Sequence, residues 1–173
     1  MKWILFSGGA VAAIVIAVVV IGMLLPRAHT ARRSVRLKYS ADAVWGLIAG
    51  DQSWRPELRK YESVSSATGQ RVWKETDKHG QTITYEAVES VAPRRMVARI
   101  ADPNLPFGGT WTYEIQPDAG GCTVTITENG EVYNPIFRFV SRFVIGHTAT
   151  IDAYLKALQT KLDEGGQADG ARA

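Results

Sequence analysis

The stretch that decides the fold reads TVTITENGEVYNPIFRF, at residues 123–139. Val124 and Ile126 alternate with threonines, which is the period-two pattern of a half-buried strand. Pro135 then opens a segment with helical spacing, a position at which proline is tolerated. The next residue on the apolar side of the strand is Glu128, so a carboxylate faces the same way as the core residues. The sequence therefore predicts a strand that leads into a helix, with a charge close to their junction.

The segment after Pro135 predicts a long C-terminal helix that extends to about Leu162. Apolar residues recur there at about 3.6 positions and form one stripe. The stripe consists of Ile136, Val140, Phe143, Val144, His147, Ile151, Leu155, Leu158 and Leu162. A helix of this length would measure about 40 Å, enough to cross a sheet, and Gly146 would let it bend. The tail at 165–173 has no periodicity, and we expect it to be disordered.

The central part of the chain predicts a run of antiparallel strands. Turn sequences such as DKHGQ at 77–81 and PDAGG at 117–121 separate strand-like runs, and short loops favour a meander. Upstream, residues 35–39 alternate as a first strand, 40–50 predict a short helix, and 51–60 predict a second short helical or turn segment. This order predicts an α+β fold in which a curved sheet wraps one long helix and leaves an apolar cavity between them.

The chain of 173 residues is long enough for one domain with a hydrophobic core. Its net charge of +3 is unevenly distributed, because residues 1–38 hold six basic side chains and no acidic one. Residues 39–173 are therefore mildly acidic, which argues against a nucleic-acid partner. The single cysteine, Cys122, excludes a disulfide within the chain.

The N-terminal segment has the composition of a membrane span. Residues 4–25 carry no charge and would form a helix of about 33 Å, against a hydrocarbon core of about 30 Å. We expect a transmembrane anchor at 1–26 and a basic juxtamembrane linker at 27–33. A cleaved signal peptide is the alternative, but the apolar run is longer than the usual hydrophobic region of such a peptide.

The distribution of basic residues predicts the orientation of this anchor. Lys2 precedes the apolar run, whereas several basic residues follow it, and basic residues beside a span stay preferentially in the cytoplasm. We therefore expect a single-pass protein of the cell membrane with its globular domain in the cytoplasm. Arg27, Arg32 and Arg33 would lie at the lipid headgroups, although stopping translocation is a simpler role for them.

Residues 34–164 resemble the START and SRPBCC superfamily, whose architecture is called the helix-grip fold. The resemblance rests on YSADAVWGLIAGDQSWRPELRKYESV at 39–64, VAPRRMVARIAD at 91–102, GGTWTYEIQP at 108–117, and the opening stretch. It implies two short helices after the first strand and a pocket for a hydrophobic or lipid-like ligand. The superfamily includes lipid carriers, polyketide cyclases and dehydratases, and protein-binding modules, so the fold does not by itself name a function.

Aromatic side chains, one histidine and the carboxylate are expected to line this pocket. The candidates are Trp54, Trp73, Tyr85, Trp111, Tyr113, Glu128, Phe139, Phe143 and His147. Tyr85, Trp111 and Tyr113 share the inward parity of adjoining strands. Phe139 and Phe143 would either gate the cavity or touch a membrane. Simple core packing is the alternative for each aromatic residue.

Glu128 is the only candidate catalytic residue. Burial would raise its pKa into a range suited to proton transfer. A structural ion pair or hydrogen bond is the alternative that we favour, because one carboxylate is an incomplete catalytic set. Its possible partners are Arg55, Arg99, Arg138 and His147.

Neither a metal nor a cofactor is expected. His29, His79 and His147 lack the spacing of metal ligands, and the glycine pairs lack the lysine and helix of a phosphate-binding loop. We favour a membrane-anchored protein that binds a lipid-like or other hydrophobic small molecule without transforming it. The alternatives are a cyclase-like or dehydratase-like enzyme that uses Glu128 as acid or base, and a protein-interaction module at the membrane with an unknown protein partner.

Overall fold

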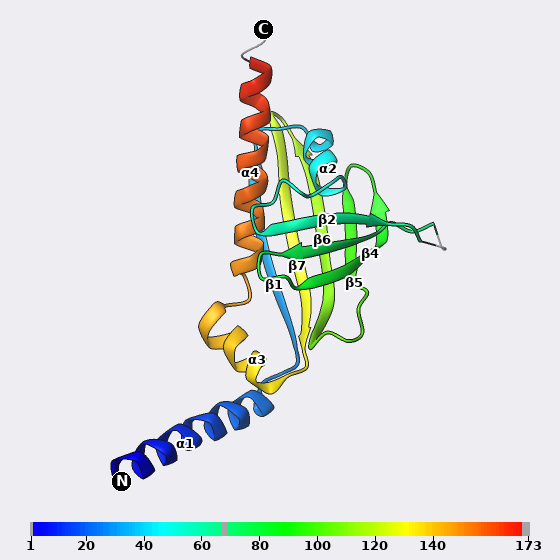
Figure 1. Ribbon diagram of the computed structural model, residues 1–173. Coiled ribbons are helices and arrows are strands. Elements are labelled where there is room, and N and C mark those ends of the chain that lie inside the picture. Colours follow the sequence, from blue (N-terminus) through cyan, green and yellow to red (C-terminus); the bar gives the residue numbers. More distant parts are fainter. Residues whose placement is uncertain (1, 67–68, 171–173) are drawn as a thin grey trace.

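One antiparallel sheet of seven strands forms the centre of the structure, in the order β1-β7-β6-β5-β4-β3-β2 (Figure 1). The structure is a computed structural model that describes residues 2–66 and 69–170, with side chains for 8–66 and 69–166. The strands are β1 (Ala28–Leu37), β2 (Leu58–Val64), β3 (Val72–Asp77), β4 (Thr82–Val91), β5 (Arg95–Ile100), β6 (Phe107–Asp118) and β7 (Gly121–Val132). The helices are α1 (Lys2–Leu24), α2 (Ala41–Ile48), α3 (Pro135–Val140), the π-helical turn η1 (Ser141–Ile145) and α4 (Ala149–Gly170). The predicted antiparallel sheet and C-terminal helix are confirmed.

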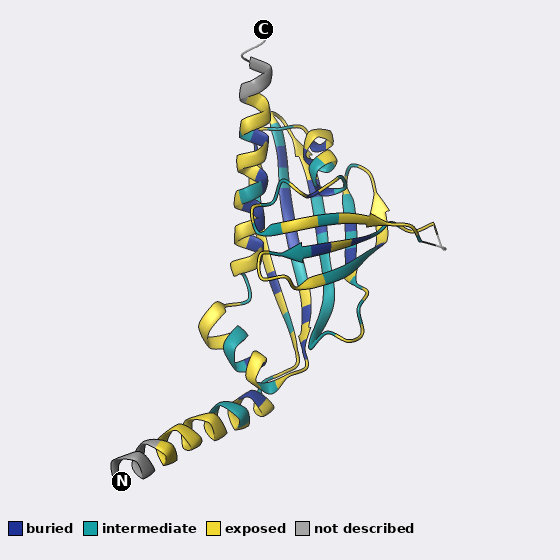
Figure 2. Ribbon diagram, in the orientation of Figure 1, coloured by how far each residue is buried: buried dark blue, intermediate teal, exposed yellow. Residues whose placement is uncertain are grey.

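Helix α4 runs along the sheet and supplies the stripe that closes the core (Figures 1 and 2). Ile151, Leu155, Leu158 and Leu162 follow helical spacing, and each is at most 7% exposed. They share one buried cluster with apolar residues of the inner sheet face, among them Ile115, Met96, Val124 and Ile126. The expected apolar stripe is therefore correct for this half of the C-terminal segment.

The C-terminal segment is nevertheless not one continuous helix. Asn134 caps α3 by accepting hydrogen bonds from the N–H groups of Ile136 and Phe137 at 2.9 and 3.2 Å. After η1, Gly146 takes a φ of 79°, a conformation that glycine adopts readily and that ends the helical run. Helix α4 starts afresh at Ala149, so the prediction of an unbroken helix is wrong. The apolar periodicity continues across the break and conceals it.

Helix α4 extends further than predicted. It reaches Gly170, so residues 165–170 of the expected disordered tail are helical, and 171–173 lie outside the described residues. An ion pair of 3.6 Å between Lys161 and Glu164, three positions apart, supports the helix at this end.

Helix α2 confirms the first of the two short helices expected after β1. The hydroxyl of Ser40 accepts a hydrogen bond from the N–H of Ala43 at 3.2 Å, as an N-terminal cap does. The second short helix, expected at 51–60, does not form in the part of the chain that the structure describes. The chain instead makes turns up to Leu58, where β2 begins.

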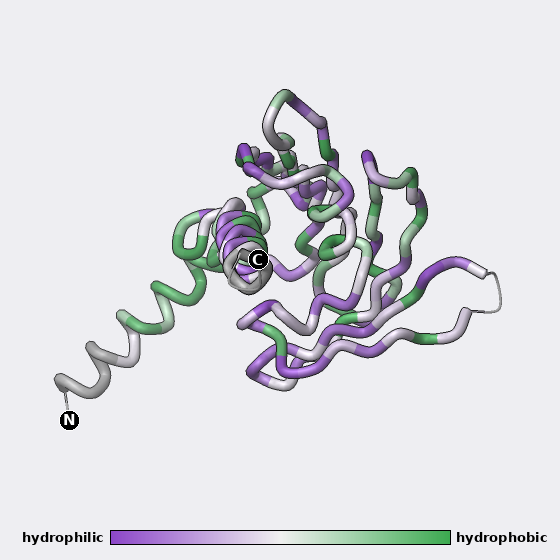
Figure 3. The backbone as a smooth tube through the Cα atoms, turned by 90° about the horizontal axis from the view of Figure 1, so that it is seen from above, coloured by the Kyte–Doolittle hydropathy of each residue, from purple (hydrophilic) through white to green (hydrophobic). Residues whose placement is uncertain are grey.

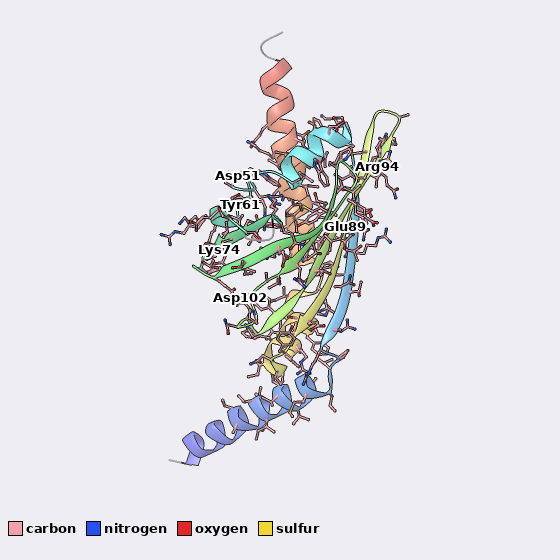
Figure 4. All side chains as sticks on the ribbon, turned by 90° about the vertical axis from the view of Figure 1, so that its right-hand side faces the viewer. Asp51, Tyr61, Lys74, Glu89, Arg94 and Asp102 are labelled. Atoms are coloured by element: carbon pink, nitrogen blue, oxygen red, sulfur yellow. The ribbon has the colours of Figure 1, made fainter. Side chains whose placement is uncertain are left out.

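Side-chain hydrogen bonds hold the turn after α2 and explain this difference. Asp51 accepts a hydrogen bond from the N–H of Ser53 at 2.7 Å. Arg71 donates to the carbonyl oxygen of Gly50 and to the hydroxyl of Tyr61, both at 2.6 Å. Asp51 and Tyr61 consequently lie close together beside α2 (Figure 4). Contacts from distant strands thus outweigh the local helical tendency.

Strand β1 begins at Ala28, so most of the basic linker expected at 27–33 belongs to the sheet. It pairs with β7 along its whole length. Ala31 is turned into the core, whereas Arg32 and Arg33 face solvent. The polar composition hid this strand, because backbone pairing with β7 needs few apolar side chains on an edge strand.

Helix α1 extends away from the sheet (Figure 1), and its surface is apolar and largely exposed where side chains are described (Figures 2 and 3). Its C-terminal end contacts α3, where a Cβ atom on Gly22 would overlap the carbonyl oxygen of Pro135. Among the described residues, no helix is long and apolar enough to cross a membrane. The structure therefore does not support the transmembrane anchor expected at 4–25; the side chains of residues 2–7 lie outside the description.

Replacing Leu158 by alanine should destabilise the domain by about 2–5 kcal/mol, because Leu158 is fully buried between α4 and the sheet. Urea unfolding of the full chain in a nonionic detergent measures this loss. Gln159→Ala, at the exposed neighbouring position, is the control and should change the free energy of unfolding by less than about 0.5 kcal/mol. Equal effects of the two variants would contradict the assigned face of α4.

Candidate functional site

A cavity of about 250 Å³ lies between the inner face of the sheet and the start of α4. Aromatic side chains from three strands line it, namely Trp73, Tyr85, Phe107, Trp111 and Tyr113. Trp73 and Tyr85 are opposite each other on β3 and β4, and their rings stack with centroids 5.6 Å apart. The alternation along each strand therefore places these rings on one face, as the sequence predicts.

A buried ion pair forms the polar part of this wall. Arg55 donates from Nη1 to Glu75 Oε2 at 2.9 Å, and Trp73 donates from Nε1 to Glu75 Oε1 at 2.9 Å. Burial lowers the pKa of Arg55, but Glu75, Tyr154, Tyr113 and the hydrogen bond to Glu57 together outweigh burial, and the net shift is upward. Arg55 thus remains charged and compensates the charge of Glu75 at the cavity wall, while its Nε also donates to Glu57 at 2.8 Å.

The pairing of Arg55 with Glu75 is not among the sequence predictions, in which Arg55 is only a partner for Glu128. The alternation of side chains along β3 could have indicated it, because Glu75 lies two residues after Trp73 and so faces the same side.

Glu128 lies at the edge of the cavity, directly opposite Trp111 on β6 and Ala31 on β1. Burial raises the pKa of its carboxyl group, and hydrogen bonding with Trp111 opposes this in part. The basic side chain paired with it is His29, whose Nε2 is 3.6 Å from Glu128 Oε1 and which carries a charge only when protonated. None of the four partners expected from the sequence forms an ion pair with it in the described structure.

Two histidines stack beside Glu128. The imidazoles of His29 on β1 and His147, between η1 and α4, lie 4.0 Å apart between ring centroids. Burial lowers the pKa of both, and the next contribution comes from His147 for His29 and from Arg142 for His147. Gly130, opposite His29, leaves the space for this ring, because a Cβ there would collide with the imidazole.

A second cavity of about 310 Å³ adjoins the first. The two share Phe107, Glu128 and Thr150 in their walls, so the carboxylate lies where they meet. Phe137 and Ile145, from α3 and η1, line the outer end of the second cavity and are exposed. Together the cavities form a path from the aromatic interior to the apolar surface of α3 and η1.

The structure places the other predicted residues as follows. His147 lines the second cavity. Trp54 packs edge-on against Tyr154 and faces a groove on the other side of α4, so it does not line either cavity. Phe139 and Phe143 pack against each other with ring centroids 5.0 Å apart and line neither cavity.

Within the described residues, no group of acidic, histidine or cysteine side chains could hold a metal ion.

The basic residues expected at a membrane surface have different surroundings. Arg33 forms an ion pair of 3.1 Å with Asp152 of α4, and Arg32 approaches Glu114 at 4.0 Å. Arg27 lines a separate pocket at the end of α1.

Solved structures share this architecture at low sequence identity. The di-domain ARO/CYC protein StfQ of the steffimycin biosynthetic pathway matches with a TM-score of 0.63 and 14% identity, covering 81% of this chain. This chain spans about half of that protein, 52% of its length. Norcoclaurine synthase from Thalictrum flavum matches with a TM-score of 0.60 and 13% identity, covering 79% of this chain and 87% of the synthase. A Thermobifida fusca protein solved by NMR matches with a TM-score of 0.58 and 22% identity, covering 75% of this chain and 90% of that protein.

These identities show a shared fold and no more. No curated protein sequence matches the chain. The family described as "Polyketide cyclase / dehydrase and lipid transport" matches residues 28–163, which include every strand, α2, α3 and the part of α4 that covers the sheet. The chain therefore belongs to the polyketide cyclase / dehydrase and lipid transport family.

Proposed function

We propose that this protein binds a lipid-like or other hydrophobic small molecule, without transforming it, in the joined cavities between the sheet and α4. The observation that carries this proposal is the aromatic inner cavity, which continues past Glu128 into a second cavity with an apolar outer end. Volumes of about 250 and 310 Å³ together fall in the range of roughly 300–1,000 Å³ typical of small-molecule sites.

The polarity of the walls supports an amphipathic ligand. The rings of Trp73, Tyr85 and Trp111 offer broad apolar surfaces, and burial raises the pKa of the Tyr85 hydroxyl, which therefore stays neutral at physiological pH. Glu75 is neutralised by Arg55, so it does not oppose an apolar ligand as an unpaired charge would. Lipid transport is also part of the family's description.

Replacing Thr150 by tryptophan should block binding. Thr150 is exposed at the start of α4 and lines both cavities, so a larger side chain there fills them without entering the core. Native mass spectrometry of the full chain, with lipids, quinones and isoprenoids added one at a time, should show a bound molecule on the wild type and at least tenfold less on this variant.

Thr160→Trp is the matched control, because Thr160 is exposed on the same helix and lines neither cavity. It should bind as the wild type does. A wild type that retains none of the molecules tested would overturn the proposed function and favour a protein-interaction module instead.

A cyclase-like or dehydratase-like activity is the second candidate, and the position of Glu128 favours it. This carboxyl group has a raised pKa, faces the point where the cavities meet, and lies 3.6 Å from His29. A half-buried acid beside an imidazole is a possible proton-transfer pair. The structurally similar StfQ is named as an ARO/CYC protein and norcoclaurine synthase as a synthase, so this fold occurs in enzymes.

Glu128→Gln separates this role from a structural one. Because the native pKa is raised, the folded protein binds more protons than the unfolded chain above about pH 4, and wild-type stability falls as pH rises through the native pKa. The glutamine variant should therefore be at least as stable as the wild type at neutral pH, and the difference should vanish below about pH 4. Urea unfolding across this pH range measures it.

A loss of more than about 1 kcal/mol at neutral pH would instead assign Glu128 a stabilising structural contact with its neighbours Trp111 and His29. An enzymatic role requires that the wild type chemically changes a bound molecule and that Glu128→Gln binds it unchanged. Recovery of the same unaltered molecule from both proteins would exclude that role.

We also propose that residues 4–25 attach the protein to the cell membrane, with the domain in the cytoplasm. The support is the uncharged run and the basic residues that follow it. The full chain should stay in the membrane pellet after an alkaline carbonate wash. Val15→Arg combined with Val19→Arg should release it, because each charge costs about 2.5–3.5 kcal/mol at the centre of a span. A wild type recovered in the soluble fraction would contradict this proposal.

A further inference from the structure

A third pocket, of about 330 Å³, lies where the end of α1 meets β1, α3 and η1. Three arginines and two histidines line it, namely Arg27, Arg138, Arg142, His29 and His147, and no carboxylate is among its lining residues. It adjoins the second cavity through the stacked histidines. The pocket is thus a concentration of positive charge in a domain whose net charge is otherwise slightly negative.

Arg138 is the central feature of this pocket, because it is a buried cation without a counterion. Its side chain is on a residue only 8% exposed. Nη1 donates to the carbonyl oxygen of Leu25 at 3.0 Å and Nη2 to that of Tyr133 at 3.1 Å, while Nε has no hydrogen-bond partner among the described residues. Carbonyl oxygens satisfy two N–H groups but do not neutralise the charge, and a buried unpaired charge is costly.

The other two arginines are also without an anionic partner. Among the described residues, no carboxylate oxygen lies within 4.0 Å of the guanidinium nitrogens of Arg27, Arg138 or Arg142. Several arginines elsewhere in the domain are paired, such as Arg33 with Asp152 at 3.1 Å and Arg95 with Glu114 at 2.8 Å, although Arg59, Arg71 and Arg94 form no ion pair within the described residues. The pocket therefore has the composition of an anion site rather than of an internal ion-pair network.

We propose that this pocket binds a phosphate group, either of a phospholipid headgroup or of a free phosphate compound. Guanidinium groups bind phosphate oxygens through paired N–H donors, and here they converge from the α1–β1 connection, α3 and η1. A tetrahedral anion suits donors that approach from several sides. Bound phosphate would supply the counterion that Arg138 lacks. This site shares His29 and His147 with the second cavity, but its three arginines line neither cavity of the proposed function, and the proposal does not depend on that function.

The surroundings fit a lipid headgroup as one of the two sources. The pocket opens beside α1, whose exposed side chains are apolar, and beside Phe143, Val144 and Ile145 of η1, which are 59–72% exposed (Figure 2). Exposed apolar side chains next to a basic pocket are typical of surfaces that meet anionic lipids.

Thermal unfolding of the full chain in nonionic detergent tests the free source. Inorganic phosphate and glycerol 3-phosphate, compared with chloride at equal ionic strength, should raise the melting temperature of the wild type. In the Arg142→Gln variant, at least tenfold more phosphate should be needed for the same rise in melting temperature, because the substitution removes a charge-assisted donor. Arg142 is exposed and unpaired, so this variant should fold as the wild type does.

Arg94→Gln is the matched control, since Arg94 is exposed and lies at the end of the sheet remote from α1 (Figure 4). It should keep the full phosphate response. Thr150→Trp should keep it as well, which distinguishes this pocket from the hydrophobic cavity.

Vesicles test the lipid source. The full chain should sediment more strongly with phosphatidylcholine vesicles that contain phosphatidic acid than with phosphatidylcholine alone, and Arg142→Gln should reduce that difference while Arg94→Gln does not. A response to vesicles without a response to soluble phosphate assigns the site to a headgroup, and the reverse assigns it to a free phosphate compound. No response to either, or equal responses of Arg142→Gln and Arg94→Gln, would overturn the proposal.

Discussion

The apolar stripe of α4 can be removed from water only by lying against the inner face of the sheet, and this constraint shapes the rest of the molecule. Each buried leucine or isoleucine of the stripe contributes roughly 1.5–3 kcal/mol by leaving water. From Ile151 to Leu162 the stripe is buried in one cluster with Val124 and Ile126 of the sheet. Towards Thr150 the helix begins and no longer fills the curve of the sheet, so the aromatic rings there face an open space. The cavity is thus a consequence of where α4 starts.

The charged side chains that line the two cavities and the adjoining basic pocket have three kinds of surroundings. In the interior, Arg55 and Glu75 neutralise each other. At the edge, Glu128 is partly desolvated and lies beside Trp111 and His29 without a permanent cation, so burial raises the pKa of its carboxyl group. At the far end, Arg138 is buried with no acid beside it. The surroundings therefore change from an apolar interior with a paired charge, past the partly buried Glu128, to a basic pocket in which Arg138 has no acidic partner.

Sequence patterns within a single strand or helix were sufficient to predict which of its side chains face the core. Strand parity correctly placed Trp111, Tyr113 and Glu128 on one face, and the helical spacing correctly identified the buried side of α4. Contacts between elements that are far apart in the sequence could not be predicted from such patterns. His29 was not recognised beside Glu128, because β1 is polar at that point and its pairing with β7 is made by the backbone. The helix break was hidden because the apolar spacing continues past Gly146.

The pairing of β1 with β7 also sets the order in which the site can form. The hydrogen bond from Thr30 to Asn129 joins residues 99 positions apart, so the first strand of the sheet has no partner until most of the chain has been synthesised. Contacts of such long range are slow to close, and the edge of β6 stays unpaired in the meantime. The apolar helix α1 leaves the ribosome before the strands of the sheet, and His147, which follows η1, leaves after them. On the ribosome, therefore, α1 is available to other molecules well before the cavities or the basic pocket exist.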